Sequence, residues 1–434
     1  QPVRAMTLAE ALAYARTHQP SVQSALARVT AAAADTRVAR AQWLPVFGAT
    51  AQAFEGTANN STASYLGVPE VALPRIGGTP VNSTGTFRPS TSTLVAVGGN
   101  QEVFDFGRIA AEAAAADVTL AAEKHRADAE RLRIELVVKD AFYGVQAARA
   151  VQEAAKEAFA RARVHRDMAA AEVKTGLHAP IELTRAEADL SRFEVAQVRA
   201  AGGLASAQSV FAAAVGVEDL MLDAAGEGSP EQPLPPLDAG LRMAADRDPL
   251  LLEARARADA AAARTRAIAA ELRPDIALTG TFSGRAGTAT PTSGPPSPDY
   301  GPLPSVANWD VGLILRWPLF DPVVAARRDA AAARAGVARA DVAVLSQQQK
   351  AIVQQAYVSA QVAESALVAL RRSVVAAHDN YAQAEARFKA GLGTSLELAD
   401  AEAVRTDAEI QLAVGQYDVQ RARAALARLL AEES

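Results

Sequence analysis

The sequence has no cysteine among its 434 residues, and aromatic side chains make up only 5% of it. Without cysteine the chain has no disulfide, thiolate metal site or cysteine nucleophile, which fits an exported protein. Half of the residues are apolar, but many of these are alanine, and a large compact core needs larger side chains. Alanine mixed with charged residues indicates instead long helices packed closely side by side.

Three further absences narrow the class of function. The formal net charge of −5 gives no indication of a nucleic-acid partner. No run reaches the roughly 18 apolar residues of a membrane-spanning helix. The five histidines share no metal-ligand spacing, and the sequence contains no nucleophile motif, glycine-rich phosphate loop or HExxH motif. We therefore expect a protein that is not an enzyme and that has no cofactor or metal.

The start of the chain has neither the basic nor the apolar segment of a signal peptide. If the protein is exported, we expect Gln1 to be the mature N-terminus after cleavage. On that condition, the lack of cysteine also argues against a lipid anchor.

The positions of the prolines reveal an internal repeat. Pro20 and Pro45 match Pro249 and Pro274 at a constant offset of 229 residues. Because proline interrupts helices, each pair bounds a helix of the same length. The sequence thus predicts two structural repeats. An internal repeat of this length implies that both halves contain the same elements in the same order. The repeats cover 1–216 and 237–434, and a connector rich in glycine and proline covers 217–236.

In each half the hydrophobic period changes to two behind the second proline, which predicts strands with one apolar and one polar face. A second such segment follows each time. The linkers between the paired segments, 55–92 and 285–307, are rich in small polar residues and resemble surface loops. The four predicted strands cover about 46–55, 93–104, 275–284 and 308–320.

The last of these segments has Trp309 and Trp317 on its apolar face. Eight residues of strand span about 27 Å, close to the ~25 Å apolar band of a membrane barrel between its aromatic girdles. A sandwich strand with two buried tryptophans is the alternative for this segment by itself. A closed barrel needs at least eight strands, so four strands per chain predict a barrel shared by several chains.

Behind each strand pair comes a long segment without proline, over 107–171 and 323–389. At 1.5 Å per residue each predicts a helix of about 100 Å. A second helical segment then returns, over 180–215 and 394–430. These segments predict two antiparallel coiled-coil hairpins, with tips at 173–180 and 388–395.

The two tips are similar in sequence. Lys, Gly, Leu and Glu recur at an offset of 215 residues, as Lys174, Gly176, Leu177 and Glu182 and as Lys389, Gly391, Leu392 and Glu397. Glycine ends the first helix of each hairpin, and the leucine beside it, exposed in a turn, favours a partner. Behind the second tip, Glu397 and Asp400 are three residues apart, so both carboxylates lie on one helix face.

The order of helix pair, strand pair and long hairpin, written twice, resembles the TolC-like outer membrane efflux protein family over nearly the whole chain. The resemblance also includes the paired prolines, the strand ends at 103–107 and 319–321, and the two tips. It implies a mainly α-helical fold with a β-barrel. Three subunits each give four strands to one twelve-stranded outer membrane barrel, which a helical tunnel continues through the periplasm.

The resemblance also implies a passive exit duct in the cell outer membrane. Such a duct exports small molecules or drugs for a tripartite efflux pump, together with a periplasmic adaptor and an inner membrane transporter of RND, ABC or MFS type. A type I protein secretion duct is the alternative within the family. A soluble periplasmic coiled-coil scaffold or adaptor is the alternative of another class, but a scaffold needs no apolar strand face bounded by tryptophan.

Residue roles follow from the same resemblance. Glu397 and Asp400 match the acidic rings that constrict the periplasmic entrance, with Glu in place of the commoner Asp at the first position. The alternative is that both simply favour a helix start, as acidic residues do. Arg185 and Glu182 form a possible gate latch, and Trp309 and Trp317 a membrane girdle. The adaptor-docking tips are Lys174, Gly176, Leu177, Lys389, Gly391 and Leu392.

Overall fold

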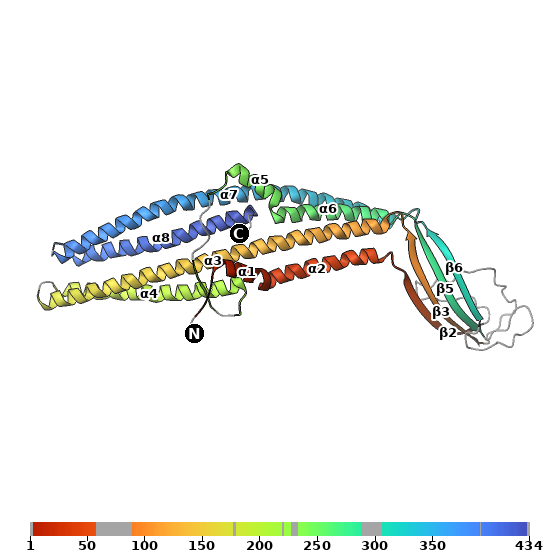
Figure 1. Cartoon of the computed structure of the whole chain (residues 1–434), viewed down its shortest axis with the longest axis horizontal. Helices are drawn as coiled ribbons and strands as arrows, with labels where there is room; N and C mark the ends of the chain where they lie inside the picture. Colours follow the sequence, from red (N-terminus) through yellow and green to blue (C-terminus); the bar gives the residue numbers. More distant parts are fainter. Residues whose placement is uncertain are drawn as a thin grey trace, which may run out of the picture. The chain divides into compact units, whose positions relative to one another are not determined.

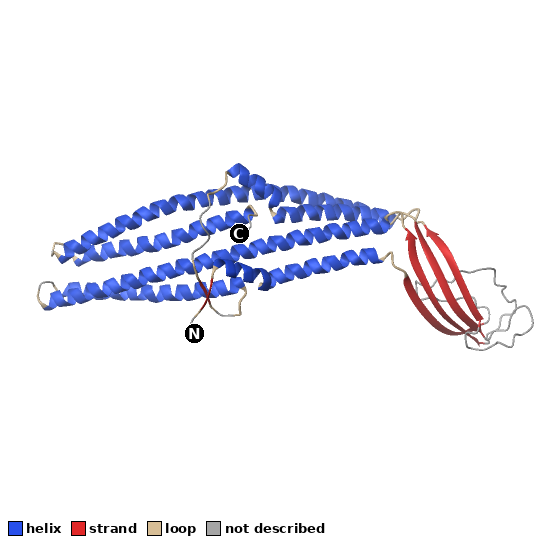
Figure 2. Cartoon of the chain, in the orientation of Figure 1, coloured by secondary structure: helices blue, strands red, loops and turns tan. Residues whose placement is uncertain are grey.

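The computed structural model describes residues 3–57, 89–176, 179–218, 221–226, 233–287, 306–390 and 392–431, and these are mainly helical (Figure 2). Among them, no helix is both long and apolar enough to cross a membrane. The elements (Figure 1) are β1 (Arg4–Met6), α1 (Leu8–His18), α2 (Pro20–Ala41), β2 (Val46–Thr57), β3 (Pro89–Phe104), α3 (Arg108–Lys174), α4 (Pro180–Val215), β4 (Leu222–Ala224), α5 (Leu237–Arg247), α6 (Pro249–Ala270), β5 (Asp275–Gly287), β6 (Val306–Arg316), α7 (Pro322–Lys389) and α8 (Ser395–Leu429).

The elements repeat in two halves, as the prolines predict. The order α1-α2-β2-β3-α3-α4 returns as α5-α6-β5-β6-α7-α8. Pro20 and Pro249 begin α2 and α6, at a position where the missing N–H has no helical acceptor in any case.

Contacts divide the chain into two units, each of which takes segments from both halves. The helical unit comprises Gln1–Thr30, Ala121–Arg255 and Ala340–Ser434, and the strand unit comprises Ala31–Leu120 and Ala256–Arg339.

The helical unit contains both hairpin tips and the largest hydrophobic core. Phe142 of α3 and Phe211 of α4 are fully buried there, with ring centroids 5.7 Å apart in an edge-to-face arrangement. Leu8 and Leu12 of α1 belong to the same core. Rings of this size provide most of the apolar area that holds such a core together. The core therefore fixes α1 against the α3–α4 hairpin.

Two short strands in the helical unit are absent from the predicted elements. β1 pairs in parallel with β4, and the register places Arg4 opposite Leu222 and Met6 opposite Ala224. Each strand has three residues, too few for a period of two to be recognised. The predicted connector 217–236 thus contains a strand, which forms a separate two-stranded sheet with β1.

The strand unit contains an antiparallel sheet in the order β2-β3-β5-β6. Its register aligns Ala49, Val97, Phe282 and Trp309 in one row across all four strands. Residues that lie directly opposite one another point to the same face. The apolar sets of all four predicted strands therefore form one continuous face of the sheet.

The apolar face is exposed, whereas the polar face is buried along the central strands β3 and β5. Trp309 is 77% exposed and Phe282 is 63% exposed, whereas Thr279, Thr281 and Ser283 on the other face of β5 are buried. A sheet that packs on a water-soluble core has the opposite arrangement. A continuous exposed apolar face of this kind calls for an apolar environment or a partner.

The end of the last strand differs from its prediction. β6 ends at Arg316, so the predicted strand 308–320 is too long, and Trp317 lies beyond the strand. Pro318 has no N–H for the ladder, and the chain continues to α7, where Asp321 accepts a hydrogen bond from the N–H of Val323 at 2.8 Å. The prediction that Trp309 and Trp317 lie on the same strand is therefore wrong. Trp309 remains on the apolar face, and Trp317 is exposed directly after the end of β6, at the start of the link to α7.

Candidate functional site

The predicted tips are the turns at the ends of the two hairpins. The first begins after Lys174, the last residue of α3, and Gly176 has a φ of 80°, a conformation that favours glycine. Leu177 lies outside the described residues. At the second tip the N–H groups of Leu392 and Gly393 both donate to the carbonyl of Arg387, at 2.9 and 3.1 Å.

The second tip exposes an apolar side chain beside a basic one. Leu392 is 75% exposed, and Gly391 before it lies outside the described residues. Lys389 lies 2.8 Å from Glu385 on the preceding turn of α7. Leu392 is thus available to a partner, while the charge of Lys389 is partly neutralised within its own helix.

The predicted gate carboxylates lie on the exposed face of the first turns of α8. Thr394 caps the helix and accepts a hydrogen bond from the N–H of Glu397 at 3.2 Å. The Glu397 carboxylate lies 3.9 Å from Arg387, and its side chain is 53% exposed. Asp400 is exposed on the same side, while Leu398 on the opposite side is buried against Phe388 and Tyr381.

The predicted latch residues form a contact between the hairpins. Arg185 lies 3.3 Å from Glu182, one turn away on α4. The other carboxylate oxygen of Glu182 accepts a hydrogen bond from the hydroxyl of Ser395, the first residue of α8. Glu182 therefore joins the start of α4 to the start of α8.

A buried ion pair that the sequence did not reveal joins the hairpins further from the tips. The Nε of Arg161 on α3 donates to both carboxylate oxygens of Glu402 on α8, at 2.8 and 3.0 Å. Glu402 is only 2% exposed and also accepts from the hydroxyl of Thr406 at 3.2 Å. Burial raises the pKa of the Glu402 carboxyl, and the hydrogen bonds from Arg161 oppose this rise.

A histidine–tyrosine contact lies beside this pair. His165 Nε2 of α3 lies 3.0 Å from the hydroxyl of Tyr381 on α7, and the Arg405 guanidinium lies 5.0 Å from the Tyr381 ring centroid. Burial lowers the pKa of His165 and raises the pKa of Tyr381 to about 12. The contact therefore joins two uncharged side chains at neutral pH.

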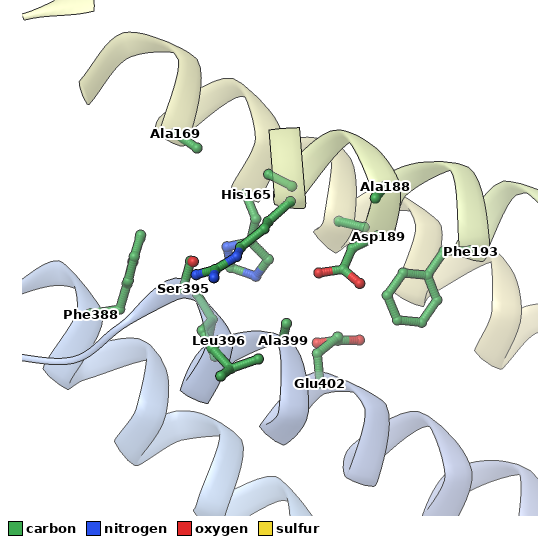
Figure 3. Close-up of a pocket in the computed structure, with 14 residues that line it drawn as sticks. His165, Ala169, Ala188, Asp189, Phe193, Phe388, Ser395, Leu396, Ala399 and Glu402 are labelled. Carbon is green, nitrogen blue, oxygen red and sulfur yellow. The ribbon is translucent and has the colours of Figure 1, made fainter. Parts of the chain in front are cut away.

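A cavity of about 260 Å³ lies between the hairpins at this level. Its walls include His165 and Ala169 of α3, Asp189 and Phe193 of α4, and Leu396 and Glu402 of α8 (Figure 3). It contains no set of ligands for a metal, and within the described ranges no cluster of His, Cys, Asp or Glu has that geometry. The arrangement can hold two hairpins together and expose charge at their tips.

Comparison with known proteins identifies the family. The sequence profile of the outer membrane efflux protein family matches residues 11–217 and 240–432. A search of curated proteins finds no match. The two matched segments include the helix pair, strand pair and hairpin of each half, which is the two-repeat architecture described above.

Solved structures agree in fold at low sequence identity. The outer-membrane channel OprN is 21% identical, with a TM-score of 0.78 over 98% of this chain and 90% of that chain. The CmeC channel of Campylobacter jejuni is 14% identical, with a TM-score of 0.78 over 98% and 85%. The open state of the MtrE channel of Neisseria gonorrhoeae is 20% identical, with a TM-score of 0.72 over 99% and 92%.

The profile match covers nearly the whole chain, which decides against the alternative of a soluble coiled-coil scaffold. The chain belongs to the outer membrane efflux protein family, and it is an outer membrane efflux duct whose helical part lies in the periplasm.

Proposed function

We propose that the protein is the trimeric exit duct of a tripartite efflux pump, opened at its periplasmic tips by an adaptor and powered by an inner membrane transporter. The observation that carries the proposal is the sheet, which has an exposed apolar face and two free edges. In the described part of the chain, neither β2 nor β6 has a neighbour on its outer side. Because β2 and β6 run antiparallel, β2 of one copy can pair with β6 of the next.

The number of strands supports three copies. One chain supplies four strands to this sheet, and membrane barrels close with eight or more. Three copies give twelve strands with a lipid-facing apolar side, while the polar side of each sheet faces the lumen. The free edges, which otherwise promote aggregation, are then all paired.

The surface of α7 supports close association of copies along the helices. Val337, Val344 and Val358 are spaced by multiples of seven residues and are each about half exposed or more. A seven-residue apolar repeat is the pattern of a coiled-coil seam. Val362, Val368 and Val375 continue the exposed apolar surface toward the tip.

The assembly can be tested with introduced cysteines, because the natural chain has none. A scan pairs one cysteine in β2 with one in β6 of the same chain. We expect oxidation in membranes to produce covalent trimers for pairs in the correct register. If every register yields monomers only, then neighbouring copies do not pair along these strands.

The tip residues take two roles in this proposal. Glu397 and Asp400 of three copies form rings of like charge that select for cations at the periplasmic entrance, and Arg185 and Glu182 latch the closed state.

Conductance in lipid bilayers tests the rings. The Glu397→Gln/Asp400→Asn variant is expected to lose cation selectivity. Glu187→Gln, which removes an exposed carboxylate of α4, serves as the control. Unchanged selectivity in the double variant excludes the rings.

Leu392 provides a test of adaptor docking. Replacing it by Glu introduces charge into an exposed apolar contact, so we expect less adaptor to be recovered with the duct in pull-downs from cross-linked cells. Val198→Glu, at a similarly exposed apolar site on α4 away from the tip, is the matched control. Equal recovery for wild type and Leu392→Glu removes this residue from the docking surface.

A further inference from the structure

The cavity between the hairpins is walled mainly by apolar groups from both of them. Phe193 comes from α4, Leu398 from α8 and Phe388 from α7, with alanines filling the remaining wall. Alanine side chains are too short to fill the space between helices that larger residues hold apart. The resulting volume of about 260 Å³ is slightly below the range of drug-sized ligand sites, so it suits a compact molecule.

Two carboxylates enter this apolar space from opposite hairpins. Asp189 reaches it from α4 and Glu402 from α8 (Figure 3). Glu402 accepts two hydrogen bonds from Arg161 and one from Thr406, and a carboxylate has about four acceptor positions. Asp189 pairs with Arg192 on its own helix at 3.4 Å. Both acids therefore have acceptor capacity left for a donor in the cavity.

Arg161 and Arg192 already compensate the charges of these two acids, so what the carboxylates offer to the cavity is their remaining hydrogen-bond acceptor positions. Arg185 lines the cavity, but its side chain is 53% exposed and it pairs with Glu182. Burial lowers the pKa of His165, so the ring is neutral at pH 7. Its Nδ1 is buried and has no hydrogen-bond partner in the described residues, although buried polar atoms nearly always have one. This atom is a further contact for a polar ligand group.

We propose that this cavity binds a small molecule with one protonated amine on a compact apolar body. The ammonium group donates hydrogen bonds to Asp189 and Glu402, and the body packs against Phe193 and Leu398. Charge-assisted hydrogen bonds are stronger than those between neutral groups. The free acceptor positions of the two carboxylates thus favour a hydrogen-bond donor such as an ammonium group over an anion of the same shape.

Binding also has a consequence for the duct, which rests on the proposed opening of the tips. Because the walls come from both hairpins, a ligand here contacts only the arrangement in which the hairpins lie together. A ligand that binds one state shifts the population toward that state. A bound amine is therefore expected to lower the frequency of channel opening.

The site is tested by calorimetry on the full-length protein in detergent, with 2-phenylethylamine as the probe and phenylacetate as a ligand of opposite charge and similar size. We expect the amine to bind and phenylacetate not to bind. Asp189→Asn should weaken amine binding at least tenfold, and Ala399→Leu, which fills the cavity from α8, should abolish it. Asp167→Asn is the control, since this carboxylate of α3 is 62% exposed and does not line the cavity.

Two results overturn the site. Phenylacetate binding as tightly as the amine contradicts a cation site, and this comparison needs no variant that must fold. Equal amine affinity in the wild type, Asp189→Asn and Ala399→Leu places the amine elsewhere. Conductance measurements distinguish amine binding in the cavity from the proposed opening of the tips. If the amine binds but channel opening is unchanged, the binding site is supported and the proposed movement of the hairpins is not.

Discussion

Arg161 and Glu402 are 241 residues apart in the chain and form a two-hydrogen-bond ion pair between α3 and α8. The side chain of Glu402 is 2% exposed and that of Arg161 is 18% exposed. Removing one partner of a buried pair leaves the other charge without compensation, whereas removing both can be nearly neutral. The pair is thus a stronger constraint on the two hairpins than the exposed ion pairs elsewhere on α3.

Replacing Arg161 by Met is expected to destabilise the protein by roughly 3 kcal/mol, because Glu402 is then buried and unpaired. Arg161→Met combined with Glu402→Met should recover most of that loss. Denaturant midpoints in detergent measure both variants. Arg133→Met is the control, since Arg133 pairs with Glu130 on the surface and such pairs contribute about 0–1 kcal/mol. A loss in Arg161→Met no larger than in Arg133→Met contradicts the assigned role.

The architecture around this pair was predictable from the sequence. Prolines that recur at one offset and glycines at the tips determine where helices start and stop, because these residues restrict the backbone locally. The period of two behind Pro45 and Pro274 likewise predicts the faces of the strands. These signals require only neighbouring residues, so a single sequence is sufficient.

The contacts between hairpins were not predictable in the same way. Arg161 and Glu402 each look like ordinary charges on a helix surface, and no local pattern relates residues so far apart. The end of β6 was misjudged because the apolar alternation continues to Leu319, past Arg316, while Pro318 removes the ladder donor. The tip residues were found because they recur, but their roles remain predictions.

The His165–Tyr381 contact predicts a dependence of stability on pH. The pKa of His165 in the folded protein lies below its ordinary value of 6.5, with Glu385, Lys389 and Arg161 as the charged groups near it. The unfolded chain therefore takes up a proton first as the pH falls below about 6.5, and stability is lost until the pH reaches the folded pKa. Above pH 6.5 the contribution is fully present.

The variant His165→Gln tests this dependence, because glutamine can keep a hydrogen bond to Tyr381 but does not titrate. We expect the melting temperature of the wild type to fall more than that of His165→Gln between pH 7.5 and pH 5.5. Each unit of pKa depression corresponds to about 1.4 kcal/mol. Parallel pH profiles for the two proteins contradict a contribution from this histidine.

The hydrogen bond that caps the start of α8 is expected to stabilise the second tip. Thr394→Ala removes the acceptor of the Glu397 N–H, and loss of such a cap costs about 1 kcal/mol. Amide hydrogen exchange over residues 395–398 should become faster, while exchange in the middle of α8 stays unchanged. Thr175→Ala at the first tip is the control, since the Thr175 hydroxyl donates to a carbonyl and caps no helix start. Equal exchange rates in wild type and Thr394→Ala rule out a stabilising cap.

Two neighbouring residues of β6 test which face of the sheet meets lipid. Leu313 is 69% exposed on the apolar face, in register with Leu278, while Ile314 lies on the opposite face with Asp310 and Arg316. An arginine on the lipid face near the middle of the membrane costs about 2–4 kcal/mol, whereas a lumen position tolerates charge. Leu313→Arg should therefore reduce the amount of folded trimer in outer membranes, judged by its mobility on gels before and after heating. Ile314→Arg should leave it near the wild-type level. If the Ile314 variant is lost and the Leu313 variant is retained, the apolar face does not meet the lipid.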